Sequence, residues 1–563
     1  MKKTAIISFL LLSIFGLQSI CAQPSPVKKA AKSIFKITTF DAEGNILHTG
    51  YGAFVGADGT CIANWNAFVG ASTANVIDGQ GRKYDVDYLI GANDIYNVAK
   101  FRVIVPEGKK MAITPLTIDA TPIPAGGNCW FVEYDVKNPA IKQYSPTKVE
   151  TFSTELPYYI FEQTAPEELA GSPFLTDAGQ LIGLMQPAQK RTDIYCPSAQ
   201  FGMGLTVSAL SANDPTIRQT NIRVGLPDDY NQATLALMMA NSNFSSPSYL
   251  VTANDFVTRF PDKTDGYIAK ADYYSAQNDI ESAQNAMNEC YEKCEDKAGA
   301  HFSYSKIIYN KVINSDSTFT AWTLDNAINE VDLAYSIDPQ PIFTMQKAKT
   351  LFAQKKFEEA YNNFYSLRET NLRGSEMFYY ASLCQQQLNA PDETILALLD
   401  STVACFEKPY NASAATYLLI RGRWLDQHGM SRKALNDFND YEQVMKQSLN
   451  DNFYYTREQI AMRAKLYQMA LDDIDKAFQL NPREPLYLCE KALILVRVNH
   501  ISEAIPVCQL SEIKFPNYGD SYAIHGLALI LDKKKAEGMK LLEKAQSLGS
   551  ELAPQFIETY GNK

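Results

Sequence analysis

The pattern of hydrophobic and polar positions divides this chain of 563 residues into two regions of different period. From Lys32 to about Leu210, short runs of β-branched and aromatic residues are separated by Gly, Asn, Asp and Pro. Ser33–Thr38, Val98–Val105 and Gln180–Leu184 are three such runs. Many short runs bounded by turn residues predict an all-β sandwich or barrel.

Beyond about Ser248 the hydrophobic period becomes 3.6, which predicts amphipathic helices of about 12 to 16 residues. The stretch between the two regions, 211–247, is rich in Asn, Ser and Pro and contains one predicted helix, Pro227–Asn241. Clusters of such residues predict loops, so we expect this stretch to be a connector.

The helical region repeats. Small residues recur twelve positions apart, in the pairs Ala271 and Ala283, Ala348 and Ala360, Gly422 and Ala434, Ala492 and Ala504, and Gly526 and Gly538. The series Ala470, Ala504 and Gly538 has a spacing of 34 residues, as do Pro482 and Pro516. A small residue on each of two antiparallel helices lets their backbones approach closely.

This spacing resembles the tetratricopeptide repeat, whose period is 34 residues. The resemblance implies an all-α solenoid over 248–560, with about eight helix pairs. The alternative is an unrelated helical bundle. A solenoid presents a concave groove, and the resemblance implies that protein segments or peptides bind the first helix of each pair. Candidate contact residues on that face are Lys349, Arg423, Tyr455 and Arg463; each could instead be a solvated helix residue.

The first 22 residues have the pattern of a secretory signal peptide. Met1-Lys2-Lys3 precedes the apolar run Ala5–Leu17 and an exit that ends at Ala22. A basic start, a short apolar run and a small residue at the cleavage site are typical of such peptides. We therefore expect export across the inner membrane of a bacterium and a periplasmic location. The alternative, a lipid anchor at Cys21, is disfavoured by the bulky Ile20.

Composition narrows the possible partners and chemistry. There are 63 acidic and 52 basic residues, a net charge of −11, which argues against nucleic acid or anionic lipid as the main partner. Only five histidines are present, so general-base and metal chemistry is restricted.

Nine cysteines follow Cys21. Their number is odd and they are scattered along the chain, which does not fit a disulfide framework. Cys290 and Cys294 lie on the same face of a predicted helix. We expect them to be either two small buried residues or a local disulfide bridge. We expect no metal and no cofactor.

Three motifs lie in the β region. The first runs from Gly50-Tyr51-Gly52 through Asp58-Gly59 to the strand ending Ala63-Asn64-Trp65-Asn66. The second is an apolar strand that opens at Asn97. The third is Glu168-Leu169-Ala170-Gly171-Ser172-Pro173, followed by Gly179–Gly183. Together they are similar to trypsin-like serine peptidases, above all the secreted bacterial branch, which implies a trypsin-like double β-barrel over 27–210.

The resemblance also implies where the catalytic triad would lie, and the residues there cannot perform its chemistry. Asn66 stands at the general base, where a carboxamide takes no proton near neutral pH. Asn97 stands at the acid and supplies no negative charge to an imidazolium. Ala170 stands at the position of the nucleophile, and its methyl side chain has no nucleophilic group. We therefore predict a domain without peptidase activity.

Two functions follow from these observations. The first is a non-catalytic extracytoplasmic scaffold or adaptor that binds proteins or peptides. The second is an active hydrolase that uses Ser172, with Glu167 or Glu168 as its base, or a triad we have not recognised. Binding of a cell-surface glycan is a further alternative. His48, on an earlier strand, is the one histidine of the β region, which argues against any mechanism that needs a histidine base.

Overall fold

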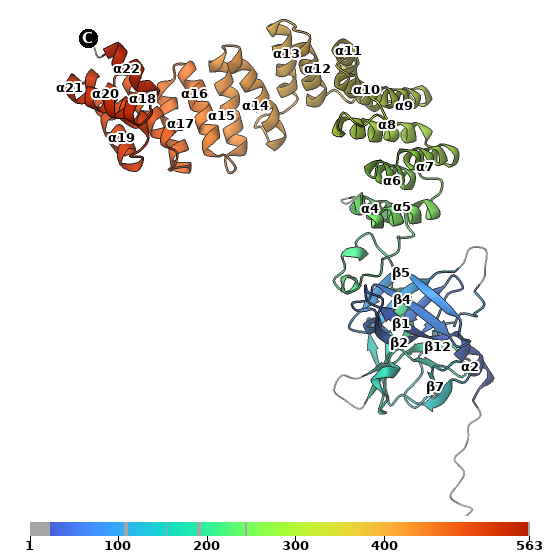
Figure 1. The fold of residues 1–563 in the computed structure, drawn as a ribbon. Helices are drawn as coiled ribbons and strands as arrows, with labels where there is room; N and C mark the ends of the chain where they lie inside the picture. Colours follow the sequence, from blue (N-terminus) through green and yellow to red (C-terminus); the bar gives the residue numbers. More distant parts are fainter. Residues whose placement is uncertain (1–22, 106–110, 154, 188–192, 242–244, 561–563) are drawn as a thin grey trace, which may run out of the picture. The chain divides into compact units, whose positions relative to one another are not determined.

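A computed structural model describes residues 23–105, 111–153, 155–187, 193–241 and 245–560. The chain divides into two compact units, one ending at Ala300 and the other beginning at His301. Figure 1 colours the chain along its sequence and labels its helices and strands. The predicted signal peptide, 1–22, and the alternative lipid anchor at Cys21 lie outside the described residues. Within the described part of the chain, no helix combines the length and the apolar character that a membrane span needs.

The first unit begins with a closed antiparallel barrel. Its strands are β1 (Ile34–Phe40), β2 (Ile46–Phe54), β3 (Thr60–Ala63), β4 (Thr73–Asp78), β5 (Lys83–Asn93) and β6 (Val98–Val103), joined in the order β1-β2-β3-β6-β5-β4. Alternate residues point inward, and Phe35, Phe54 and Phe101 are at most 1% exposed in the barrel core. The barrel that the strand pattern predicts is therefore present.

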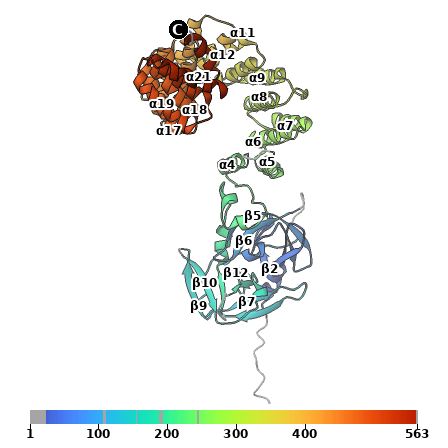
Figure 2. The same cartoon turned by 60° about the vertical axis from the view of Figure 1, so that its left-hand side comes forward.

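The following strands form two sheets of four (Figure 2). One has the order β12-β11-β7-β8 and the other β13-β14-β10-β9. Their bounds are β7 (Cys129–Glu133), β8 (Ala140–Tyr144), β9 (Lys148–Phe152), β10 (Leu156–Phe161), β11 (Pro173–Leu175), β12 (Leu181–Leu184), β13 (Gln186–Pro187) and β14 (Ile194–Pro197). A single bridge between Gly183 and Ser198 links the two sheets. A Cβ at Gly183 would lie 2.2 Å from the Pro197 carbonyl oxygen, so only glycine permits this approach.

The first part of the predicted connector is hydrogen-bonded to the barrel. The Gly70 N–H donates to the Gln219 carbonyl at 2.7 Å, and the Leu89 N–H donates to the Arg223 carbonyl at 2.8 Å. Ile217 and Ile222 pack in the barrel core. This segment therefore extends the β domain beyond residue 210. The predicted helix of the connector is α4 (Tyr230–Ala240), after the short α3 (Ala199–Gly204).

Helices occupy the rest of the chain. In the first unit they are α5 (Pro247–Arg259), α6 (Asp265–Ala276) and α7 (Ile280–Lys293), and α8 (Lys297–Asn314) spans the division. The second unit continues with α9 (Leu324–Ile337), α10 (Pro341–Ala353), α11 (Phe357–Ser366), α12 (Ser375–Gln387), α13 (Asp392–Ala404), α14 (Ala412–Gln427), α15 (Ser431–Met445), α16 (Asp451–Arg463), α17 (Tyr467–Leu480), α18 (Pro485–Arg497), α19 (Ile501–Lys514), α20 (Gly519–Leu531), α21 (Lys535–Ser547) and α22 (Leu552–Tyr560).

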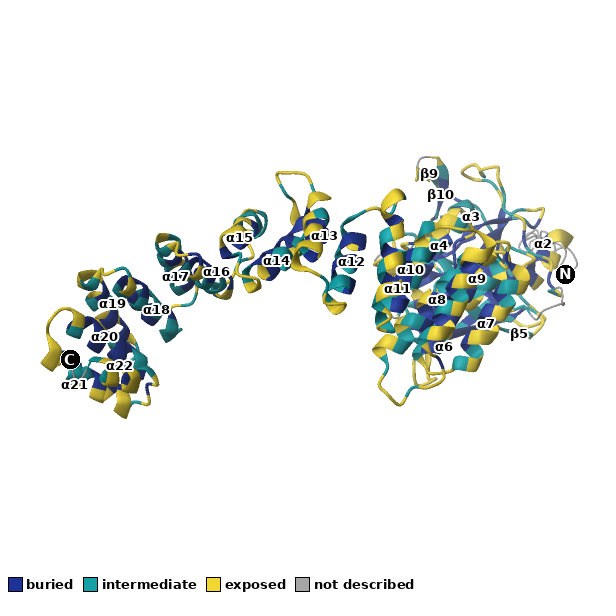
Figure 3. Ribbon diagram, turned by 90° about the horizontal axis from the view of Figure 1, so that it is seen from above, coloured by how far each residue is buried: buried dark blue, intermediate teal, exposed yellow. Residues whose placement is uncertain are grey.

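Consecutive helices are in contact from α4 to α7 and from α9 to α22, and each of them carries buried residues (Figure 3). The small residues act as expected. A Cβ on Gly526 of α20 would lie 2.7 Å from the Gly538 carbonyl, and one on Gly538 of α21 would lie 2.6 Å from the Gly526 carbonyl. The two backbones are thus in direct contact, which larger residues would prevent. A β domain followed by a helical-repeat region is the architecture of the chain.

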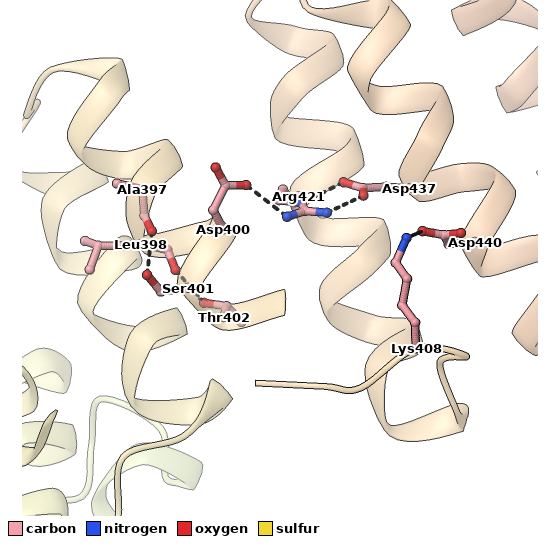
Figure 4. Close-up of polar contacts among 9 residues, drawn as sticks. All are labelled: Ala397, Leu398, Asp400, Ser401, Thr402, Lys408, Arg421, Asp437 and Asp440. Atoms are coloured by element: carbon pink, nitrogen blue, oxygen red, sulfur yellow. Dashed lines mark hydrogen bonds and ion pairs between the residues drawn. The ribbon is translucent and has the colours of Figure 1, made fainter. Parts of the chain in front are cut away.

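Ion pairs add to the apolar contacts between helices. Arg421 of α14 donates to both carboxylate oxygens of Asp437 in α15, at 2.9 and 2.6 Å, and to Asp400 of α13 at 2.9 Å (Figure 4). Lys408 pairs with Asp440 at 3.2 Å in the same region. Arg421 therefore joins three successive helices through one guanidinium group, a geometry that suits its planar fork of donors.

Candidate functional site

The structure brings together Asn66 and Asn97, two of the positions that the resemblance assigned to a triad. Asn66 lies in the 3-10 turn Trp65–Phe68 that follows β3, and Asn97 directly precedes β6. The Asn97 side-chain oxygen accepts the Asn66 backbone N–H at 2.8 Å, and its carbonyl accepts the Trp65 N–H at 3.2 Å. Asn97 is buried and has a φ of +46°, a conformation in which Asn is enriched.

This pair can hold a backbone but cannot move a proton. The Asn97 oxygen is committed to the amide of position 66, and the Asn66 side chain is exposed. A carboxamide neither accepts a proton near neutral pH nor carries a charge that would stabilise a protonated neighbour. The geometry therefore joins the two positions by a hydrogen bond, without the groups that acid–base catalysis needs.

Ala170 lies on a turn whose backbone is hydrogen-bonded internally. It follows the 3-10 turn Glu167–Leu169, and its N–H donates to the Glu167 carbonyl at 3.0 Å. The next N–H, that of Gly171, donates to the Met185 carbonyl at 2.9 Å. An oxyanion hole needs free backbone N–H groups that point at the reacting oxygen. Here the N–H groups of both residues are already bonded to carbonyls of the chain.

Ser172, the alternative nucleophile, is inaccessible. It is 0% exposed, and its hydroxyl has no hydrogen-bond partner among the described residues. Its N–H donates to the Leu169 carbonyl at 3.0 Å, and its own carbonyl accepts the Met185 N–H at 2.8 Å. His48 is exposed on β2, and Glu167 and Glu168 are exposed on the turn. The hydroxyl thus has neither an adjacent base nor a path to substrate in this conformation.

Asn64, a residue to which sequence reasoning gave no role, lies where strand β2 meets the Ala170 turn. The Tyr51 N–H donates to the Ala170 carbonyl at 3.1 Å and lies 3.3 Å from the Asn64 side-chain oxygen. A Cβ at Gly50 would lie 2.1 Å from that oxygen, and a Cβ at Gly171 would lie 2.8 Å from it and 2.1 Å from the Tyr51 carbonyl. Glycines at 50 and 171 therefore make room for Asn64.

The Gly171→Ala substitution is expected to destabilise the β domain. Gly171 has a φ of +85°, so an alanine is strained there and also clashes with Tyr51. Gly126→Ala is the matched control, because Gly126 has a φ of +77° and open space around its Cα. We expect Gly171→Ala to lower the free energy of unfolding by about 1 to 2 kcal/mol more than the control does in urea denaturation. Equal losses in the two variants would contradict the close approach.

Gln186 is a second residue that sequence reasoning missed. Its side-chain N–H donates to the Ile95 carbonyl at 2.9 Å, and its oxygen accepts the Tyr158 hydroxyl at 3.2 Å. The adjacent Tyr96 ring packs on Phe152 with centroids 4.4 Å apart. The turn that precedes Asn97 is thereby tied to the sheet containing β9 and β10. No local pattern in the sequence indicates this contact.

Three of the four candidate binding residues in the helical region make contacts between helices. Lys349 of α10 pairs with Glu376 of α12 at 2.7 Å. Arg463 of α16 binds both carboxylate oxygens of Asp426 in α14, at 3.1 and 2.7 Å. The Tyr455 ring of α16 lies 5.6 Å from the Tyr487 ring of α18, centroid to centroid. These three side chains therefore link first helices of neighbouring pairs.

Arg423 differs from them. It is exposed on α14 and, within the described chain, makes no hydrogen bond or ion pair. It lines a cavity of about 200 Å³ together with Leu419, Tyr441, Phe453 and Thr456 of α14, α15 and α16. A free guanidinium beside aromatic rings suits a carboxylate or a carbonyl of a partner. Elsewhere, no group of three or more His, Cys, Asp or Glu able to hold a metal occurs among the residues that the structure describes.

Comparisons with known proteins give partial similarities. No protein-family model matches the chain. Over 211 residues it is 28% identical to the DnaJ homolog subfamily C member 7 homolog of Dictyostelium discoideum, which covers 36% of this chain and 33% of that protein. The chain thus matches about a third of this relative's length.

Two solved structures are also similar to part of the chain. A protease from M. tuberculosis in its active form has a TM-score of 0.27 and 18% identity, over 33% of this chain and 86% of that one. The serine endoprotease from Yersinia pestis has a TM-score of 0.27 and 14% identity, over 34% and 65%. The described elements define a protein that couples a β domain to helical repeats.

Proposed function

We propose that this protein is a non-catalytic extracytoplasmic scaffold, in which a trypsin-like double barrel without peptidase activity is fused to a tetratricopeptide solenoid. The observation that supports the absence of peptidase activity is the Ala170 turn. The position of the nucleophile holds a methyl group, and the N–H groups of Ala170 and Gly171 are bonded to carbonyls of the chain. Asn66 and Asn97 remain hydrogen-bonded to each other but lack basic and acidic groups.

The helical repeats would provide the binding activity. They make up more than half of the chain. Some of their cations form ion pairs between helices, as Lys349 and Arg463 do. Arg423 keeps its charge free beside Tyr441 and Phe453. A protein or peptide partner with an acidic group fits this position, whereas the net charge of −11 argues against nucleic acid. The expected signal peptide supports a periplasmic location, with association to an envelope complex.

The proposal of inactivity predicts that the purified chain does not react with a fluorophosphonate probe and does not cleave a peptide library. Ser172→Ala is the decisive variant. The Ser172 hydroxyl is buried without a partner, so its removal should leave folding intact. Labelling of the natural chain that disappears in Ser172→Ala would overturn the proposal and establish the hydrolase alternative.

The scaffold proposal predicts that a partner captured from envelope extract by the full chain is lost in Arg423→Glu. Lys433→Glu is the control, because Lys433 is also exposed, lies on the neighbouring helix α15 and does not line the cavity. Both changes alter the net charge by the same amount, so a general charge effect would weaken both. Capture that Arg423→Glu and Lys433→Glu retain equally would remove the basis for a binding role of Arg423.

A further inference from the structure

Two cysteines are in contact at the end of α7. The Cys290 thiol donates to the Cys294 sulfur, and the two Sγ atoms are 3.6 Å apart. Both residues are buried, at 0% and 3% exposure. The other seven cysteines of the described chain make no sulfur–sulfur hydrogen bond. This pair is therefore distinguished from the other cysteines, which are scattered along the chain.

The backbone brings the two residues one helical turn apart. The Cys294 N–H donates to the Cys290 carbonyl at 2.9 Å, which closes the last turn of the helix. Residues so spaced have Cβ atoms about 5 to 6 Å apart, and a disulfide needs about 3.5 to 4.5 Å. Cys294 caps the helix with an extended backbone, φ −92° and ψ 148°. Because it stands outside the regular helix, Cys294 is the residue that can move the remaining distance.

We infer that Cys290 and Cys294 form a disulfide during folding in an oxidising compartment. One cysteine thiolate attacks the disulfide of a thiol–disulfide oxidoreductase, forms a mixed disulfide and releases one thiolate. The second cysteine thiolate then attacks the sulfur of the first, which releases the other thiolate of the oxidoreductase. The two protons lost by the cysteine thiols are taken up by the two released thiolates, so two electrons and two protons reduce the disulfide of the oxidoreductase to its dithiol. The exchange takes place before α7 packs, because burial raises the pKa of both thiols in the folded state.

The bond would close the short loop 290–294, so its effect on the unfolded chain is small. Its local effect is larger. In the thiol form Cys294 contacts the Pro261 carbonyl at 4.0 Å, in the loop between α5 and α6. That carbonyl also accepts the hydroxyl of the fully buried Tyr267 at 3.0 Å. A disulfide fixes the end of α7 and removes the thiol donor from Pro261, so the contact between α7 and this loop depends on the redox state of the two cysteines.

Trypsin provides a direct test, because Lys293 separates the two cysteines. The full chain is refolded in a mixture of oxidised and reduced glutathione, unfolded in urea with iodoacetamide so that every free thiol is alkylated, and digested without reduction. We expect the peptide Ala271–Lys293 to be joined to Cys294–Lys297, with a mass two hydrogens below the sum of the two thiol peptides. Dithiothreitol should separate them, and both should then become alkylated.

Cys405 is the internal control, since it is the exposed cysteine of the described set and should be alkylated or glutathionylated under all conditions. In Cys294→Ser the joined species should vanish and Cys290 should be found alkylated, while the circular dichroism of the folded chain is unchanged. Two separate, fully alkylated peptides from correctly folded natural chain would overturn the inference. A bond from either cysteine to a different cysteine would also overturn it.

Discussion

Replacing Arg457 with methionine is expected to lower the free energy of unfolding of the second compact unit by about 3 to 5 kcal/mol. Arg457 of α16 is 3% exposed and donates to both carboxylate oxygens of Asp473 in α17, at 2.8 and 2.7 Å. It also donates to Glu442 of α15 at 2.6 Å. Asp473 is itself 1% exposed, so loss of the guanidinium leaves a buried carboxylate without its partner.

Arg463→Met is the matched control on the same helix. Arg463 also binds a carboxylate through two N–H groups, but its side chain is 51% exposed, so this pair should contribute about 0 to 1 kcal/mol. Urea denaturation of the natural chain and both variants measures the difference. A loss in Arg457→Met no larger than that in Arg463→Met would show that the buried network does not hold α15, α16 and α17 together.

A double variant separates the cost of an unpaired charge from the value of the pair. In Arg457→Met with Asp473→Leu, no carboxylate remains buried at position 473, so much of the lost stability should return.

The dependence of stability on acid pH gives a second check. The hydrogen bond from Arg457 is the largest of the interactions that lower the pKa of Glu442, to about 2 against the opposing effect of burial. A carboxyl group with a lowered pKa stabilises the fold above about pH 4.5, and this stabilisation is lost as the pH falls towards 2. The free energies of unfolding of the natural chain and of Arg457→Met should therefore converge in acid.

Sequence patterns identified the contacts that depend on local spacing. Gly526 and Gly538 are twelve residues apart, and the structure places their backbones in contact. The resemblance to trypsin-like peptidases predicts that Asn66 and Asn97 lie together, and a hydrogen bond joins them. Periodic spacing was sufficient for the first contact, and the motifs of a known family were needed for the second.

Contacts that depend on tertiary register were not accessible in this way. Gln186 binds the Ile95 carbonyl 91 residues away, and no periodicity connects the two. The segment after residue 210 pairs with β5 through Leu89 and Arg223, although its composition is that of a loop. The bidentate pairs Arg421–Asp437 and Arg457–Asp473 share a spacing of 16 residues, which a comparison of the repeats could have found.

The repeats also contain one exception, Glu458, and it predicts a pH-dependent stability. Glu458 lies twelve residues before Ala470 and 34 before Ala492, where other pairs have Ala or Gly. It is 0% exposed; one carboxylate oxygen accepts the Gln459 amide at 2.6 Å and the other has no hydrogen-bond partner among the described residues. Burial, reinforced by Glu490 of α18 and Asp473 of α17, raises the pKa of Glu458 to about 7.

A raised carboxyl pKa means that the folded chain binds a proton more tightly than the unfolded chain does. The free energy of unfolding should therefore fall by about 3 kcal/mol as the pH rises from about 4.5 to 7. Over this range the carboxyl ionises in water in the unfolded chain, whereas the folded chain must keep its proton or bury the charge. Glu458→Gln should remove this slope and make the chain more stable at pH 8, while Glu543→Gln, at an exposed position of α21, should change neither. Urea denaturation at pH 5 and 8 measures both effects. If Glu458→Gln kept the slope of the natural chain, the buried carboxyl would not be its source, and Glu490, whose pKa burial also raises, would be the next residue to replace.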